Sequence, residues 1–183
     1  MTRIQEQSIN VLHPVPPRAG DVVLRGVVLA ISCVISYWLI THILGYAYSI
    51  SRDDDLLGGM WAVVATIFVY RYSHAESVRA ALSRMAATSV SFALCLVYLL
   101  LFPFHLWGMA ALIGIAAIVV TLIGRADDTI TTGITIAVVM VVAALSPHNA
   151  WRQPILRMLD TAVGVAVGVG AAWIGSRFTL AKA

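Results

Sequence analysis

The chain has 183 residues, of which 60% are hydrophobic and 11% charged, and its net charge is +3. A soluble domain carries about 25% charged residues, and a small globule leaves much of its surface in water, so this composition excludes a water-soluble fold. The arginines are scattered between apolar runs rather than gathered in one patch, which argues against nucleic acid as a partner. The lipid bilayer is the solvent that fits this chain.

The N-terminal segment differs from the rest of the chain, because residues 1–20 are polar and contain three prolines. The apolar run after Arg25 is too long for the core of a signal peptide. We therefore expect a cytoplasmic tail at 1–20 without a single conformation, a transmembrane domain at 21–178 and a cytoplasmic C-terminus at 179–183.

Six apolar runs follow in chain order, and each approaches the roughly 20 residues that cross a bilayer as a helix. The predicted spans lie near 24–49, 57–72, 84–103, 106–124, 130–146 and 158–176. Charged or proline-containing segments separate them. The predicted fold is therefore an all-α membrane protein with six transmembrane helices.

Two of these helices are expected to begin well before their apolar cores. Ser73 and Glu76 have the spacing of a capping box, in which the serine caps the helix and the glutamate reaches back. Ser146 precedes Pro147, as a capping residue precedes a proline at the first helical position. The first turns of the third and sixth helices would then carry arginines at the membrane boundary.

The distribution of the 12 Lys and Arg residues predicts the orientation. With the N-terminus inside, the inside segments hold most of them: Arg3, Arg18, Arg25, Arg71, Arg79, Arg84, Arg125, Arg177 and Lys182. The outside segments hold Arg52, Arg152 and Arg157. We expect a multi-pass protein of a bacterial inner membrane with both termini in the cytoplasm.

The chain repeats itself at a spacing of 73 residues, which aligns 52–93 with 125–166. Eleven of these 42 positions are identical: Arg52/Arg125, Asp54/Asp127, Asp55/Asp128, Val69/Val142, Ser73/Ser146, Arg79/Arg152, Arg84/Arg157, Met85/Met158, Thr88/Thr161, Val90/Val163 and Ala93/Ala166. Because most of the matches are polar, chance does not account for them. Each copy (about 24–103 and 106–176) holds three spans, so the second copy enters the membrane from the opposite side. The prediction is two three-helix inverted repeats.

Inverted repeats are common among transporters, whose substrate sites lie at the repeat interface near the midplane. The second and fifth predicted spans also look short and interrupted, by Gly58-Gly59 and by Thr131-Thr132-Gly133. Interrupted segments at matching places in two halves indicate such a site. The alternative is a duplicated packing unit without transport. Small residues every four positions, Gly164, Gly168, Ala172 and Ser176, predict close helix contact inside the protein or between subunits.

Two stretches resemble a known family. One runs from Trp61 through 77–88, and the other covers 152–161 and the following Ala-Val-Gly-Val-Ala-Val-Gly. They are similar to the fusaric acid resistance and aromatic acid exporter superfamily, with which plant aluminium-activated malate transporters are grouped. The shared pattern is a Trp-Ala span followed by a helix reading Arg-x4-Arg-x3-Thr-x-x-Gly. Ser89 and Ser91 replace the glycines expected after Thr88, whereas the second copy keeps Gly164.

The resemblance covers roughly 24–178 and implies a six-span unit that moves organic anions, often aromatic carboxylates. Many members join two such units to a large cytosolic domain. This chain carries one unit, so we expect a homodimer or higher homo-oligomer.

The leading candidate site residues are Arg84 and Arg157, because charged groups at membrane depth are costly and usually functional. Each has a threonine four residues later, Thr88 or Thr161, which places a guanidinium and a hydroxyl on one helical face. Arginine can bind a carboxylate through two hydrogen bonds. Arg79 and Arg152 lie earlier on the same helices and would attract anions. The alternative is that these arginines extend to lipid headgroups.

Acidic residues are candidates for coupling or gating. Asp160 has no acidic counterpart in the first copy and follows Arg157 by three residues, so it either forms an ion pair within the helix or couples proton movement to anion movement. The remaining acids come as two matching pairs: Asp54, Asp55, Asp127 and Asp128. These pairs either cap helices and mark interfaces or exchange arginine partners as a gate.

No enzyme motif occurs, and Cys33 and Cys95 lie in apolar runs as small hydrophobic residues rather than metal ligands. We therefore expect no cofactor and no enzymatic activity. The predicted function is permeation of organic anions as an exporter or channel. The rival interpretation is a membrane scaffold or accessory subunit that does not transport.

Overall fold

The computed structural model describes residues 19–44, 52–145, 147 and 149–180. Within these ranges the protein is helical, and its long helices are α2 (Ala19–Trp38), α4 (Arg52–Val69), α5 (His74–Leu101), α6 (Leu106–Leu122), α7 (Thr129–Leu145) and α8 (Arg152–Leu180). A π-helical segment (Leu39–Leu44) continues α2, and a 3-10 turn (Ala126–Asp128) precedes α7. The six predicted helices are thus present. Residues 1–18 of the predicted tail (1–20), residues 181–183 and Ser146 lie outside the described residues, whereas Ala19 and Gly20 already belong to α2.

In the part of the chain that the structure describes, four helical segments are long and apolar enough to cross a membrane: Ala19–His42, His74–Leu101, Ala126–Leu145 and Arg152–Arg177. Helix α6 is shorter, at 17 residues, and α4 has 18 residues with three aspartates in its first turn. Many large hydrophobic side chains lie exposed on the surface of the bundle. A bilayer would cover them, so the protein is a multi-pass membrane protein.

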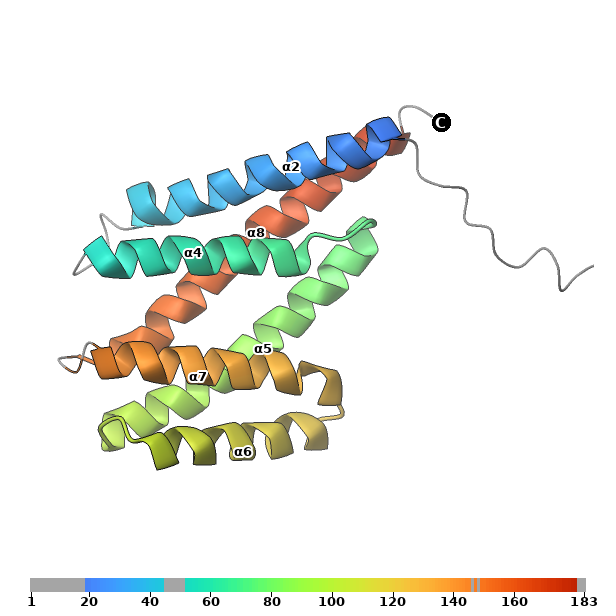
Figure 1. The fold of residues 1–183 in the computed structure, drawn as a ribbon. Coiled ribbons are helices and arrows are strands. Elements are labelled where there is room, and N and C mark those ends of the chain that lie inside the picture. Colours follow the sequence, from blue (N-terminus) through green and yellow to red (C-terminus); the bar gives the residue numbers. More distant parts are fainter. Residues whose placement is uncertain (1–18, 45–51, 146, 148, 181–183) are drawn as a thin grey trace, which may run out of the picture.

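The helices run back and forth between two ends of the bundle (Figure 1). The start of α2, the α4–α5 and α6–α7 connections and the end of α8 lie at one end, which we call the terminal end. The end of α5, the start of α6 and the start of α8 lie at the opposite end, which we call the distal end.

The two sequence repeats correspond to two halves of the fold, α2, α4 and α5 in the first and α6, α7 and α8 in the second. The third helix of each half packs against the first two helices of the other half. Helix α8 lies against α4 and α2, while α5 lies against α7 and α6, and α5 and α8 also contact each other. Figure 1 shows the result as an upper group of α2, α4 and α8 and a lower group of α5, α6 and α7. The third helices, α5 and α8, are therefore exchanged between the two halves.

Local sequence explains where several helices begin and end. Ser73 caps α5, because its hydroxyl accepts a hydrogen bond from the Glu76 backbone N–H at 3.2 Å. Pro103 follows the end of that helix and prevents its continuation. Gly124 ends α6 with a φ of 81°, a left-handed conformation that glycine adopts without steric cost. The predicted early starts of α5 and α8 are confirmed.

Two details of the sequence prediction are wrong. Pro147 is not the first helical residue of α8, which begins at Arg152. Helices α4 and α7 also run continuously through Gly58-Gly59 and Thr131–Gly133, so neither is interrupted. The glycines of α4 instead permit close packing, since a Cβ on Gly59 would lie 2.7 Å from the Tyr37 ring of α2.

The two glycines of the small-residue stripe of α8, Gly164 and Gly168, lie inside the protein at the crossing with α4. A Cβ on Gly164 would lie 2.2 Å from the Ala62 carbonyl oxygen, and one on Gly168 would lie 3.0 Å from that of Thr66. Thr66 also donates a hydrogen bond to the Gly164 carbonyl at 3.0 Å. These two glycines therefore form an internal contact and do not serve a subunit interface.

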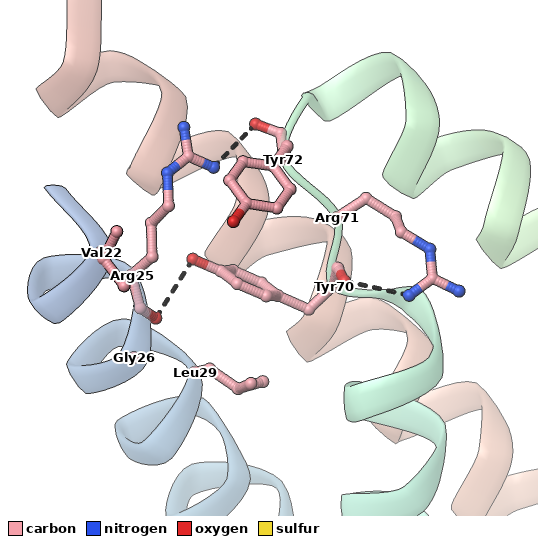
Figure 2. Close-up of a pocket in the computed structure, with 7 residues that line it drawn as sticks. All are labelled: Val22, Arg25, Gly26, Leu29, Tyr70, Arg71 and Tyr72. Atoms are coloured by element: carbon pink, nitrogen blue, oxygen red, sulfur yellow. Dashed lines mark hydrogen bonds between the residues drawn. The ribbon is translucent and has the colours of Figure 1, made fainter. Parts of the chain in front are cut away.

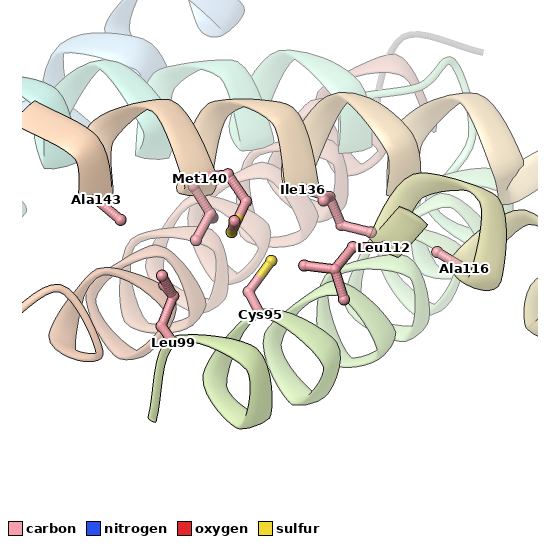
Figure 3. Packing of buried hydrophobic residues seen from close by; sticks show 8 residues of the cluster. Cys95, Leu99, Leu112, Ala116, Ile136, Met140 and Ala143 are labelled. Atoms are coloured by element: carbon pink, nitrogen blue, oxygen red, sulfur yellow. The ribbon is translucent and has the colours of Figure 1, made fainter. Parts of the chain in front are cut away.

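A second close contact joins the lower group. Ser91 of α5 donates to the Thr132 carbonyl of α7 at 3.2 Å. Next to it, buried apolar side chains of three helices pack together (Figure 3). The cluster comprises Cys95, Leu99, Leu112, Ala116, Ile136, Val139, Met140 and Ala143. Cys95 is fully buried among them, in keeping with its interpretation as a small hydrophobic residue.

Candidate functional site

The two leading arginines are buried in the bundle. Arg84 on α5 is 5% exposed and Arg157 on α8 is 2% exposed, so neither guanidinium extends to the lipid headgroups. Thr88 and Thr161, one turn further along the same helices, are also buried. A buried charge is costly unless other groups compensate for it, so each of the two guanidinium groups needs compensating neighbours.

Arg157 is compensated by an ion pair. Its Nη1 lies 3.2 Å from Oδ2 of Asp160, three residues later on α8. Asp160 in turn packs against α4 at Gly58, where a Cβ would lie 2.9 Å from Oδ1. The glycine in α4 thus leaves the space that the Asp160 carboxylate occupies.

A hydrogen bond connects the same region of α8 to the first turn of α4. The Gln153 amide donates from Nε2 to Oδ1 of Asp54 at 3.1 Å, and Gln153 is buried. Asp54 also interacts electrostatically with Arg157. One buried cation therefore lies near two carboxylates towards the distal end.

Arg84 has a different environment, made of aromatic rings. Its guanidinium carbon lies 5.7 Å from the centre of the Trp61 ring and 4.9 Å from that of Phe68, both on α4. Cation–π contact compensates part of the cost of burying the charge. Among the described residues, Arg84 forms no ion pair. Its positive charge is therefore not neutralised by an acidic side chain in that part of the chain.

The buried residues of α4, α5 and α8 share one unusual property: several of their polar atoms have no hydrogen-bond partner among the described residues. These atoms are Trp61 Nε1, Arg84 Nε, Thr88 Oγ1, Gln153 Oε1, Arg157 Nε and Nη2, Asp160 Oδ2 and Thr161 Oγ1. Asp160 Oδ2 nevertheless has its ion pair with Arg157. Buried polar groups are normally satisfied, so such a concentration calls for an explanation. Most of these atoms are donors, which suits an anion with several acceptor oxygens.

The other candidate cations are not buried. Arg79 is exposed on α5, and Arg152 is exposed at the start of α8 with its guanidinium 5.6 Å from the centre of the Trp151 ring. The structure therefore buries both Arg84 and Arg157 with their threonines, Arg84 beside aromatic rings of α4 and Arg157 beside Asp160, and leaves the earlier arginines at the surface.

The acidic pairs behave in different ways. Asp128 is buried and accepts hydrogen bonds from the Arg125 guanidinium at 2.6 Å and from the Ser83 hydroxyl of α5. It therefore joins the α6–α7 connection to α5 at the terminal end. Asp127 is exposed and Asp55 is partly buried. Arg52 belongs to α4, but its side chain lies outside the described residues.

Sequence reasoning did not identify Gln153 and Trp61 as parts of this region, and it associated Gly58 with a site only as a supposed interruption of its span. Gln153 precedes Arg157 by four residues and so lies on the same face of α8, a signal that helical spacing already contained. The proximity of Gly58 and Trp61 to the charged side chains depends on how α4 crosses α8 and α5. No spacing within one helix reveals that crossing.

Within the described residues, no group of three or more His, Cys, Asp or Glu side chains is arranged to hold a metal ion. The fold and this buried region thus define a helical, multi-pass membrane protein with uncompensated polar groups in its interior. A family model described as fusaric acid resistance protein-like matches residues 31–171. The chain belongs to that family, as its sequence resemblance predicted, and the family is one of membrane transport of organic compounds. Comparison with curated proteins and with solved structures gave no match.

Proposed function

We propose that the protein is a permeation unit for organic anions such as aromatic carboxylates, either an exporter or a channel. The observation that carries the proposal is the set of buried, unpartnered donors around Arg84, Thr88, Arg157 and Thr161. A carboxylate accepts charge-assisted hydrogen bonds from guanidinium groups and further hydrogen bonds from hydroxyls. The rings of Trp61 and Phe68 beside Arg84 offer an aromatic substrate a surface to stack on.

The exchanged packing of the two halves supports an inverted-repeat mechanism. Helix α8 crosses α4 at Gly164, and α5 crosses α7 at Ser91, the residue that corresponds to Gly164 in the 73-residue alignment. The matched residues Arg84 and Arg157 then lie on α5 and α8, the two helices that are exchanged between the halves. Alternating access would rock one group of three helices against the other and expose the site to each side in turn.

The charge distribution supports the proposed location in a bacterial inner membrane with the terminal end in the cytoplasm. Most described arginines with exposed or partly buried side chains lie towards that end: Arg25, Arg71, Arg79, Arg125 and Arg177. Cytoplasmic loops are enriched in Lys and Arg. Six spans form one unit of the arrangement that the family resemblance implies, so we propose that it works as a homodimer or higher homo-oligomer.

Anion flux through liposomes that contain the full chain tests the site. We expect Arg84→Gln to reduce fusarate or benzoate flux by about 10- to 100-fold, because a hydrogen bond to a charged group contributes about 1.5–3 kcal/mol. Arg84→Lys should retain part of the flux. Arg177→Gln is the matched control, since that exposed arginine also lies against an aromatic ring, with its guanidinium 5.1 Å from the centre of the Trp173 ring.

Wild-type flux in a correctly folded Arg84→Gln variant would remove the anion-site assignment. Absence of flux in the wild-type protein, together with a stable complex with another membrane protein, would favour the scaffold function instead. A scaffold could recruit its partner through the small-residue stripe of α8, but Gly164 and Gly168 of that stripe contact α4 inside the bundle.

Asp160→Asn distinguishes a proton-coupled carrier from a channel. The amide keeps the size of the side chain but cannot release and take up a proton. If Asp160 couples proton movement to anion movement, we expect the variant to lose accumulation of anion driven by a proton gradient while downhill exchange continues. Liposomes with and without an imposed pH difference provide the measurement. Unchanged uphill transport would exclude Asp160 as the coupling group.

A further inference from the structure

A groove separate from the buried arginines lies at the terminal end, between α2 and the α4–α5 connection (Figure 2). Its volume is about 390 Å³. Helix α2 contributes Val22, Arg25, Gly26 and Leu29, and the opposite side is formed by Tyr70, Arg71 and Tyr72. The groove therefore opens where the apolar part of α2 begins.

Arg25 is held in place at one end of the groove. Its Nη1 donates to the Tyr72 carbonyl at 3.0 Å, and its guanidinium carbon lies 4.6 Å from the centre of the Tyr72 ring. The Tyr70 hydroxyl donates to the Arg25 carbonyl at 3.5 Å, which ties the two sides of the groove together. These contacts use one of the guanidinium nitrogens, so the other N–H groups can donate to a ligand.

The charge in the groove is positive. Its lining includes two arginines and no acidic residue. Asp21 lies one turn before Arg25, but the ion pairs among the described residues are Arg125–Asp128 and Arg157–Asp160. In Figure 2 the Arg71 side chain points away from Arg25, so it adds positive potential rather than a second contact. An anionic group is the complementary ligand.

An apolar strip of α2 flanks Arg25 on both sides along the helix. Val22, Gly26 and Leu29 are spaced by four and three residues and so share one face of the helix. A Cβ on Gly26 would meet nothing within 4 Å, which makes this position an open notch in the strip. A ligand that occupies both the positive end at Arg25 and the apolar strip needs an anionic head and a hydrocarbon chain.

We propose that this groove binds an anionic phospholipid, with its phosphate at Arg25 and an acyl chain along Gly26 and Leu29, which follow Arg25 away from the terminal end. Basic pockets between transmembrane helices at the membrane boundary favour anionic headgroups, and tyrosines suit that depth. A small free anion would use the arginine and leave the apolar strip unfilled. The lipid would also stabilise the contact between α2 and the α4–α5 connection, independently of any transport route.

The test uses the full chain, purified in detergent and stripped of lipid. Native mass spectrometry measures retention of phosphatidylglycerol and of phosphatidylcholine with the same acyl chains, with inorganic phosphate as a competitor. We expect the wild type to retain phosphatidylglycerol preferentially. Arg25→Gln should reduce that preference about fivefold, because an arginine near the membrane surface attracts an anionic lipid by about that factor. Arg25→Lys should restore most of the preference.

Gly26→Leu fills the notch without removing charge, and we expect it to reduce phosphatidylglycerol retention to a similar extent. Arg177→Gln removes an exposed arginine near the same end and should leave retention unchanged. Equal preference in the wild type and Arg25→Gln overturns the proposal, as does full retention in Gly26→Leu. Displacement of the lipid by inorganic phosphate at equal concentration would assign the groove to a free phosphate instead. If Arg25→Gln fails to fold, Gly26→Leu still decides the result.

Discussion

Replacing Arg157 with methionine is expected to lower the free energy of unfolding by about 3–5 kcal/mol. Arg157 is among the largest fully buried side chains, and its partner Asp160 is also buried. Methionine reproduces the unbranched part of the arginine side chain as far as Nε but carries no charge to neutralise the carboxylates of Asp160 and Asp54. An uncompensated buried charge is costly in a medium of low dielectric constant, and this cost accounts for the expected size of the effect.

The double variant Arg157→Met with Asp160→Leu separates loss of the ion pair from loss of packing. An apolar pair of similar volume often replaces a buried ion pair at little cost, so we expect the double variant to recover much of the lost stability. Unfolding in mixed SDS and detergent micelles, followed by tryptophan fluorescence, measures both variants. A double variant less stable than Arg157→Met would show that Asp160 contributes through contacts other than this ion pair.

The second large effect is expected at the crossing of α4 and α8. Gly164→Ala should lower the free energy of unfolding by about 2–3 kcal/mol, because the added methyl group would lie 2.2 Å from the Ala62 carbonyl oxygen and 2.7 Å from the Ala65 Cβ. The helices must separate to relieve this overlap. Their separation would also weaken the hydrogen bond from Thr66 to the Gly164 carbonyl.

Gly170→Ala is the matched control, since it makes the same substitution on the same helix. A Cβ on Gly170 would meet nothing within 4 Å, and alanine favours a helix over glycine by about 1 kcal/mol. We therefore expect this variant to be as stable as the wild type or slightly more stable. Similar stability of the two alanine variants, measured by the same unfolding assay, would mean that α4 and α8 do not approach closely at Gly164.

Much of the fold follows from local sequence. In lipid each helix must satisfy its own backbone hydrogen bonds, so the apolar runs and the charged segments between them predict six helices. The cap at Ser73 and the ion pair between Arg157 and Asp160 depend on residues three positions apart, which one helix brings together whatever surrounds it. For the same reason, the placement of Thr88 beside Arg84 and of Thr161 beside Arg157 was predictable.

The candidate site was predictable only in part. Arginines and threonines could be chosen from the repeat, but burial separates Arg84 and Arg157 from the exposed Arg79 and Arg152, although all four match the same pattern. Gln153 and Asp54 are 99 residues apart and meet because α8 crosses α4. A repeat indicates which positions correspond, but it does not say which of them face the interior.

The sequence by itself determined that this protein lies in a membrane, the number and approximate positions of its main helices and its family, because these depend on composition and on contacts within a few residues. The tertiary structure decided that Gly58 makes room for Asp160 rather than interrupting α4, and that Gly164 serves an internal crossing. It also decided that α5 and α8 are exchanged between the halves and that Arg25 meets Tyr72 at a groove. Such outcomes depend on the shapes of two surfaces that are distant in the chain, and hydropathy and spacing along one helix do not contain that information.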